Sequence, residues 1–262
     1  MNVIKVYAGL GNQMFQYALG KSMEANGIKV CYDLSWFAKP ADPPRPFALN
    51  KFRTDISVGG FMNKKTIHES DSEGYTFNPK YLTMEDVNFF GYWQHQGYVQ
   101  NVLPLLREHF KVRPKLYTER YLELKEQIVC SESIALHVRR GDYLTKGHHL
   151  LPIEYYAKAL DILVEKKVEG KVYVFSDDVT WCEEIFIGNH FVFVNEVDYL
   201  SFDLMRLCPH KIVANSTFSW WAAMVGDIYN GMTMAPLRWR LRDDQEEKIK
   251  EQGFIPEHWI RI

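Results

Sequence analysis

Short apolar runs alternate with segments of helical periodicity throughout the second half of this chain. The apolar runs stop at polar or turn-forming residues, and the segments between them repeat apolar side chains every three or four positions, as amphipathic helices do. Strands that alternate with helices build parallel sheets with crossover helices. We therefore expect parallel strands, with their carboxyl ends at one edge of the sheet, at residues 134–138, 171–175, 191–194, 211–214 and 232–235.

The first half of the chain is less regular. Residues 3–8 predict a strand that turns at Gly9 and Gly11 into a helix, but Met14 stands where a dinucleotide-binding fingerprint needs a third glycine. The turn can still bring backbone amides close to a ligand. Further elements are expected as strands at 28–34 and 88–94, a helix around 102–110, a proline-rich loop at 39–46 and no clear pattern at 47–83.

Length and composition narrow the class of protein. The 262 residues could form one large domain or two of ordinary size, and we place the two domains at residues 1–125 and 126–262. Lys plus Arg number 31 against 33 Asp plus Glu, so no overall positive charge attracts nucleic acid. The four cysteines show no metal-ligand spacing, and no apolar run is long enough to span a membrane. We expect a cytoplasmic protein that is at most peripheral to the inner membrane.

The run at 134–138 ends in a group of polar residues, namely His137, Arg139, Arg140 and Asp142. Ligands of open parallel sheets bind outside the carboxyl ends of the strands. Two adjacent arginines there suit a diphosphate, since each guanidinium can hold an anion with two hydrogen bonds. The alternative is an ion pair between one arginine and Asp142, with His137 in the core.

Two other strand ends should share that edge. Asp177 and Asp178 follow the strand at 171–175, and a run of small polar residues follows the strand at 211–214. That run can cap the next helix, whose free amides attract an anion. Arginines and a helix N-terminus at one edge favour a nucleotide diphosphate. The polar run contains Asn215, Ser216, Thr217 and Ser219.

Together these segments resemble the bacterial α-1,2-fucosyltransferases of glycosyltransferase family 11. The resemblance implies a GT-B-like α/β fold, with two Rossmann-like domains facing across a cleft. It also implies GDP-fucose as the donor, inversion at the anomeric carbon and no required metal or other cofactor. The matching segments, in family order, are 9–18 (GLGNQMFQYA), 91–94 (GYWQ), 137–143 (HVRRGDY), 175–178 (FSDD) and 215–221 (NSTFSWW).

The resemblance also implies roles for single residues. Arg139 would grip the donor diphosphate and stabilise the leaving group, and Arg140 would brace the motif or share that charge. His137 would lie near guanine or ribose, and either Asp177 or Asp178 would pair with guanine. Ser216 and Thr217 would contact the phosphates. Asn12, counted as catalytic, and Gln13 would lie on the acceptor-side domain, close to the reacting fucose. The residues expected to bind the donor also include Gly11, Asn215 and Ser219.

The resemblance does not identify the general base or the acceptor. Candidates for the base are Asp142, His148 and His149. The expected acceptor is a galactose-containing oligosaccharide or glycolipid of a capsule or O-antigen, selected by residues 47–83 and 92–95.

Two rival hypotheses belong to other classes. The chain could be a non-catalytic glycan- or nucleotide-sugar-binding module. It could also be a metal-dependent transferase or hydrolase, although the adjacent Asp177 and Asp178 lack the spacing of a metal-binding Asp-x-Asp element.

Overall fold

The structure is a computed structural model that describes residues 1–39, 45–70, 74–145, 147–226 and 231–262. The chain divides into two units, Met1–Lys111 with Glu247–Pro256, and Val112–Glu246 with Glu257–Ile262. The division thus falls after residue 111 and not at the expected 125. The reason is that helix α3 (Glu119–Val129) packs against α6 (Asp198–Leu207) of the second unit.

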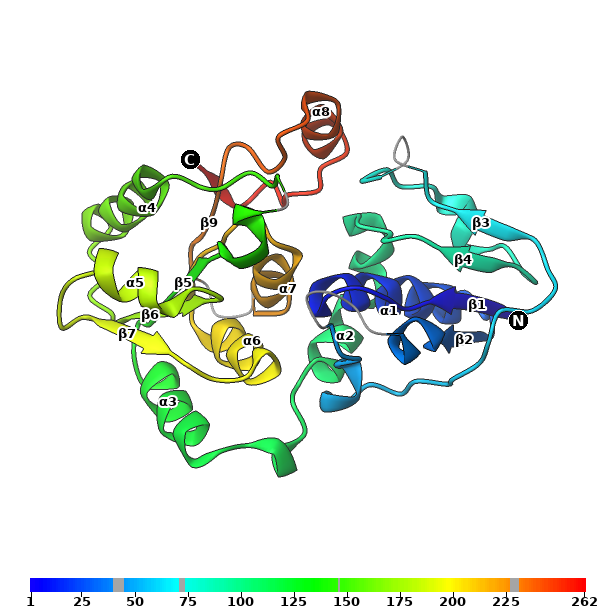
Figure 1. The fold of residues 1–262 in the computed structure, drawn as a ribbon, viewed down its shortest axis with the longest axis horizontal. Coiled ribbons are helices and arrows are strands. Elements are labelled where there is room, and N and C mark those ends of the chain that lie inside the picture. The colour runs from blue at the N-terminus through cyan, green and yellow to red at the C-terminus, as the bar shows by residue number, and fades with distance from the viewer. Residues whose placement is uncertain (40–44, 71–73, 146, 227–230) are drawn as a thin grey trace. The chain divides into compact units, whose positions relative to one another are not determined.

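A parallel sheet forms the centre of the first unit, with its strands in the order β2-β1-β4-β3. Helix α1 (Leu10–Ala25) connects β1 to β2, and α2 (Leu103–His109) follows β4 (Figure 1). The strands are shorter than the apolar runs predicted, and β3 lies in the region without a clear pattern. Their bounds are Asn2–Lys5 for β1, Val30–Asp33 for β2, Thr66–His68 for β3 and Asn88–Phe90 for β4.

The second unit contains a larger parallel sheet with the strand order β10-β9-β8-β5-β6-β7. The five strands expected here are all present, and their ends agree with the predicted runs to within one or two residues. The strands are β5 (Ile134–Val138), β6 (Val172–Ser176), β7 (Phe191–Val194), β8 (His210–Ile212), β9 (Thr233–Ala235) and β10 (Ile260–Arg261).

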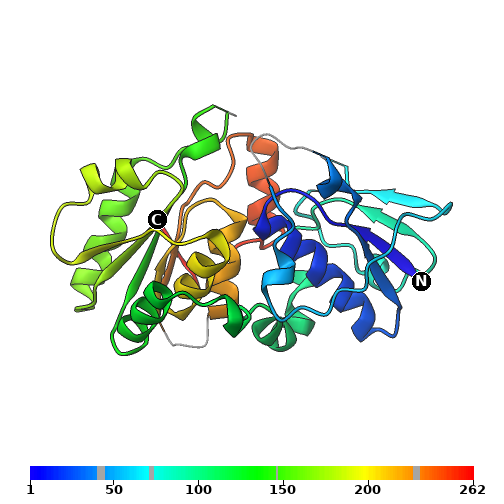
Figure 2. The same cartoon turned by 60° about the horizontal axis from the view of Figure 1, so that its bottom comes forward.

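Helices cover both faces of this sheet (Figures 1 and 2). On one face, Leu136 and Val138 of β5 join a core with Tyr156 of α4 (Ile153–Glu165) and Cys182 of α5 (Val179–Ile185). On the other face lie α3, α6 and α7 (Thr217–Gly226). Every residue of β5 is buried, which explains why its run is apolar apart from His137.

The C-terminal part of the chain returns to the first unit. After α8 (Asp243–Glu251), Phe254 packs 6.1 Å from the ring of Phe15 and 5.1 Å from that of Tyr75. The ring Nε2 of His95 lies 2.6 Å from the carbonyl oxygen of Gln252. Within the described ranges, every helix is too short or too polar to cross a membrane.

Candidate functional site

The carboxyl ends of β5 and β8 flank the topological switch point of the second sheet. From β5 the chain continues to β6 and β7 on one side, and it returns through β8, β9 and β10 on the other. Open parallel sheets bind ligands at such a point, because the loops leave the two strands in opposite directions. The loop after β5 carries Arg139 and Arg140, and the loop after β8 carries Asn215 and Ser216. The two main groups of predicted site residues therefore lie on neighbouring loops.

The guanidinium of Arg139 is held between two carboxylates. One terminal nitrogen pairs with Asp142, and Nη1 lies 3.0 Å from Oδ2 of Asp177. The same group lies 5.3 Å from the ring centre of Tyr143. In the part of the chain that the structure describes, its buried Nε has no hydrogen-bond partner. The ion pair considered as an alternative to anion binding thus exists, and it leaves one N–H of Arg139 unpaired among the described residues.

Arg140 is fixed by a different set of contacts. Its Nε lies 3.1 Å from Oδ2 of Asp178, and its guanidinium lies 4.0 Å from the ring centre of Trp181. Its backbone N–H donates to Oδ1 of Asp177 at 2.9 Å. A Cβ on Gly141 would overlap the carboxylate of Asp177, so only glycine lets that carboxylate reach the loop. Asp177 consequently links both arginines.

Asp178 also caps a helix. Its Oδ1 accepts the N–H of Trp181 at 3.3 Å in the first turn of α5, and its own N–H donates to Oγ of Ser176 at 2.9 Å. Both Asp177 and Asp178 therefore have structural partners. The predicted pairing of one of them with guanine stays a prediction.

His137 is buried beside these charges. Its ring lies 5.5 Å from that of Phe218 in α7, and only 5% of the residue is exposed. Burial, and to a smaller extent the positive charge of Arg139, lowers the pKa of His137 to about 3. At neutral pH the imidazole is uncharged. It therefore adds no positive charge to the site, and its predicted place near guanine or ribose stays a prediction.

Ser216 caps the first turn of α7, and Ser219 braces it from within. Oγ of Ser216 accepts the N–H of Phe218 at 3.3 Å. Ser219 is fully buried, and its hydroxyl donates to the carbonyl of Ala214 at 3.2 Å. Ser219 therefore braces the turn, whereas Ser216 and Thr217 stand at the N-terminus of the helix, where an anion would bind.

Asn215 connects three segments around this turn. Its Nδ2 donates to the carbonyl oxygens of His149 at 2.7 Å and Trp239 at 3.1 Å. Its own carbonyl accepts the hydroxyl of Tyr143 at 3.0 Å. Asn215 thus positions the loops of the site, in addition to any contact with the donor.

Sequence reasoning missed the segment that follows β9. Glu246 accepts the N–H groups of Trp239 at 2.8 Å and Arg240 at 2.9 Å, which fixes the backbone that Asn215 contacts. The sequence could have indicated this segment, because the strand expected at 232–235 ends at the same edge of the parallel sheet as β5.

The predicted residues of the first unit lie where β1 turns into α1. Asn12 accepts a hydrogen bond from Nε2 of Gln94 at 2.9 Å. The side chain of Gln13 is buried, and its amide bonds to backbone groups of Ala8, Pro46 and Ala48 at 2.9 to 3.0 Å. Gln13 therefore braces a loop. Gly11 is buried in the first turn of the helix.

Comparison with known proteins places this architecture in a family. The family described as glycosyl transferase family 11 matches residues 1–262. The chain belongs to this family. An α-1,2-colitosyltransferase of Escherichia coli is 32% identical over 99% of this chain and 98% of its own length. The O-antigen biosynthesis glycosyltransferase WbnK of E. coli is 28% identical over 94% and 97%, respectively. Galactoside α-(1,2)-fucosyltransferase 2 of Rattus norvegicus is 24% identical over 100% of this chain and 77% of its own length.

Solved structures agree on the fold of this family 11 protein. The α-1,6-fucosyltransferase NodZ co-crystallised with GDP aligns at a TM-score of 0.55, with 15% identity over 84% of this chain and 91% of that chain. NodZ from Bradyrhizobium aligns at 0.50, with 14% identity over 84% and 92%. The expected GT-B-like α/β class, with a parallel sheet in each unit, is confirmed.

The three candidates for the general base lie near the β5 loop of this family 11 chain. Asp142 pairs with Arg139, and the ring of His148 lies 4.5 Å from that of Tyr143. Burial and the charge of Arg238 lower the pKa of His149. Among the described residues, no three His, Cys, Asp or Glu side chains form a group that could hold a metal ion.

Proposed function

We propose that this protein is an inverting galactoside α-1,2-fucosyltransferase of surface glycan synthesis, which moves L-fucose from GDP-fucose to the 2-hydroxyl of a galactoside. The observation that carries the proposal is the convergence of Arg139, Arg140 and the N-terminus of α7 at the β5/β8 switch point. In a family 11 chain, such an anion site suits the diphosphate of a nucleotide sugar.

Fucosyl transfer depends mainly on stabilisation of the GDP leaving group. The fucosyl carbon passes through an oxocarbenium-like state while GDP gains negative charge. The guanidinium of Arg139 and the N-terminus of α7 would stabilise that charge. Because Asp142 and Asp177 already pair with Arg139, the diphosphate would share the guanidinium with them. Those carboxylates would hold the planar group in place for the transition state.

The direct test is incubation with GDP-fucose and lactose. Release of GDP together with a new trisaccharide that carries fucose on the 2-hydroxyl of galactose supports the proposal. Binding of GDP-fucose and lactose without turnover would instead favour a non-catalytic binding module on the same scaffold.

GDP-colitose should be tested as a donor in the same assay, because the E. coli relative at 32% identity is an α-1,2-colitosyltransferase. Colitose is fucose without its 3-hydroxyl. A site that hydrogen-bonds this hydroxyl should reject GDP-colitose by roughly 10⁴-fold in kcat/KM, whereas an apolar subsite for colitose would accept fucose with a loss of only about 10²-fold. The ratio of the two kcat/KM values decides which donor the protein uses.

Kinetics and thermal stability together can distinguish a contact of Arg139 with the diphosphate from a purely structural ion pair. Arg139→Lys keeps a positive charge but loses the planar fork, so we expect kcat to fall on the order of 10²-fold or more. An arginine that only braces Asp142 would give a lower melting temperature with normal kcat. Arg120→Lys is a matched control, since Arg120 forms an exposed ion pair with Glu123 at 3.0 Å. Normal kcat in the folded Arg139→Lys protein would refute its contact with the diphosphate.

A further inference from the structure

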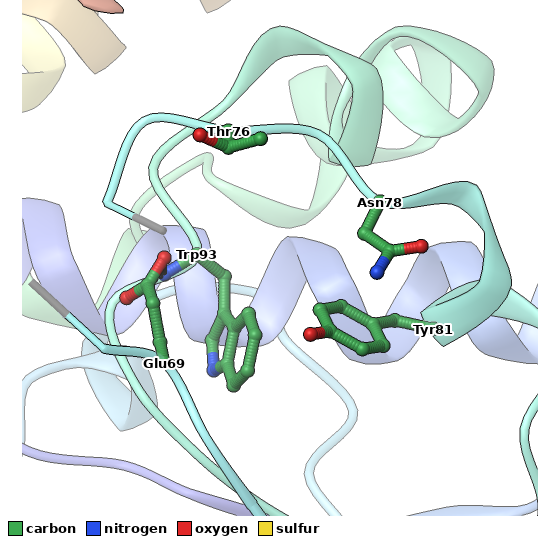
Figure 3. Close-up of a pocket in the computed structure, with 5 residues that line it drawn as sticks. All are labelled: Glu69, Thr76, Asn78, Tyr81 and Trp93. Atoms are coloured by element: carbon green, nitrogen blue, oxygen red, sulfur yellow. Dashed lines mark hydrogen bonds between the residues drawn. The ribbon is translucent and has the colours of Figure 1, made fainter. Parts of the chain in front are cut away.

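A small pocket lies at the carboxyl ends of β3 and β4 in the first unit (Figure 3). Its cavity has a volume of about 50 Å³, well below the roughly 300–1,000 Å³ of pockets for drug-sized ligands. It can therefore receive only the edge of one ring of a larger ligand. The pocket is lined by Glu69, Thr76, Asn78, Tyr81 and Trp93.

Two residues at this pocket have a strained backbone conformation. Trp93 has a φ of 58°, and Tyr75, which precedes Thr76, has a φ of 66°. Large side chains rarely adopt such values, because they are unfavourable for any residue with a Cβ. Strain of this kind persists where surrounding contacts impose it, and it gathers at functional sites. Two strained aromatic residues beside one small pocket therefore point to a ligand.

Glu69 imposes the conformation of Trp93. Its carboxylate accepts the N–H of Tyr92 at 2.6 Å and the N–H of Trp93 at 3.0 Å. A Cβ on Gly91 would overlap the side chain of Glu69, so the glycine leaves room for this contact. The loop after β4 is thus fixed by a carboxylate that follows the neighbouring strand β3.

The polar groups of the pocket suit hydroxyl groups. Glu69 can only accept hydrogen bonds, whereas the indole Nε1 of Trp93 can only donate. Within the described ranges this buried Nε1 has no partner. Oδ1 of Asn78 accepts the N–H of Lys80 at 3.1 Å, and Figure 3 shows the amide nitrogen of Asn78 turned toward Tyr81. A ligand for this set must both donate and accept, as a hydroxyl does.

The aromatic walls and the charge narrow the ligand class further. The rings of Tyr81 and Trp93 meet edge to face with centroids 5.5 Å apart, and the partly exposed Tyr81 offers apolar surface next to the polar groups. The five lining residues include one carboxylate and no cation, so an acidic sugar or a phosphate would be repelled. A neutral sugar ring combines hydroxyls with apolar C–H faces and carries no charge.

The loop also connects the pocket to the predicted position of the reacting fucose. Gln94, the residue after Trp93, donates to Asn12 at 2.9 Å. Asn12 lies in the first turn of α1, which follows β1, and Gln94 lies in the loop after β4. The strands β1 and β4 are neighbours at the switch point of the first sheet. Resting on the proposed function, we propose that this pocket binds one neutral sugar ring of the acceptor glycan.

The test measures sugar binding without any donor, by saturation-transfer difference NMR with lactose and methyl β-D-galactoside as probes. Thr76→Trp should fill the pocket and reduce binding more than tenfold. Thr76→Val keeps the shape but removes a hydroxyl, and should weaken binding roughly 2- to 10-fold. Thr83→Trp, in the same segment but outside the lining residues, is the matched control and should bind normally. Methyl β-D-glucuronide should not bind.

The outcomes separate this inference from the proposed function. If neither neutral probe binds the wild type, or if both bind Thr76→Trp as well as the wild type, the pocket is not an acceptor subsite. The proposed transfer from GDP-fucose would be unaffected by this result, because the assay with GDP-fucose and lactose tests it separately. If the neutral probes bind and Thr76→Trp abolishes their binding, the subsite stands even should GDP-fucose not react. Equal binding of the glucuronide would contradict the charge argument.

Discussion

Replacing His137 should make the stability of the protein less sensitive to acid. His137 lies at the end of the central strand β5, and burial lowers its pKa from the ordinary value near 6.5 to about 3. Between these values the unfolded chain binds a proton that the folded protein does not. Stability is therefore complete above pH 6.5 and is lost as the pH falls toward 3.

The size of the effect follows from the two pKa values. One pKa unit corresponds to about 1.4 kcal/mol, so going from pH 8 to pH 5 should cost the folded wild type about 2 kcal/mol through His137 alone. The side chain is buried, so solvent screening does not reduce this figure greatly. Arg139 contributes by disfavouring a second positive charge.

The assay is urea unfolding of wild type and His137→Phe at several pH values. Phenylalanine has a similar shape and no proton to bind, so the stability of the variant relative to wild type should rise by about 2 kcal/mol from pH 8 to pH 5. Other titrating groups are common to both proteins and cancel in this difference. His190→Phe, at an exposed position of the same unit, serves as control. Parallel curves for wild type and His137→Phe would refute the assignment of a neutral buried imidazole.

Two further predictions concern the proposed reaction. Asn12→Ala should leave the dissociation constant of GDP unchanged and lower transfer, because the candidates for diphosphate and guanine binding all lie on the second unit; equal changes in both quantities would contradict this. Activity should be the same in EDTA as in buffer, because we propose that Arg139 and the N-terminus of α7 stabilise the leaving group. Loss of turnover that Mg²⁺ or Mn²⁺ restores would show that a metal is needed.

The second unit could be predicted from sequence because its pattern is local. An apolar run such as 134–138 is buried on both faces, so it stands out against the polar loops on either side. In a parallel sheet all strands end at one edge, so Arg139, Asp177 and Ser216 could be placed together without knowing the strand order. The order itself, and thus the switch point between β5 and β8, required the structure.

The first unit was harder to predict from the sequence, because its elements depend on contacts between residues far apart in the chain. Strand β3 has only three residues, and its neighbour β4 lies 20 residues later in the chain. The role of Glu69 follows entirely from this pairing, so no local pattern could reveal it. The return of the C-terminal segment to Phe15 and Tyr75 is likewise a matter of tertiary packing.

The loops after β4 and β5 are fixed in the same way, by a carboxylate that follows a neighbouring strand. In the first, Glu69 after β3 binds backbone N–H groups after β4, and Gly91 leaves room for it. In the second, Asp177 after β6 binds the N–H of Arg140 after β5, and Gly141 leaves room. A carboxylate on a neighbouring strand thus holds each loop in place.

This shared arrangement predicts that two isosteric substitutions affect different substrates. Each removes the charge of one carboxylate and weakens its hydrogen bonds to the loop, since bonds to a charged group contribute roughly 1.5–3 kcal/mol. Glu69→Gln should release Trp93 and raise the KM for lactose, with the KM for GDP-fucose unchanged. Asp177→Asn should loosen Arg139 and Arg140 and raise the KM for GDP-fucose or lower kcat, with the binding of lactose unchanged. If both variants altered the same kinetic constant, the two loops would not serve separate substrates.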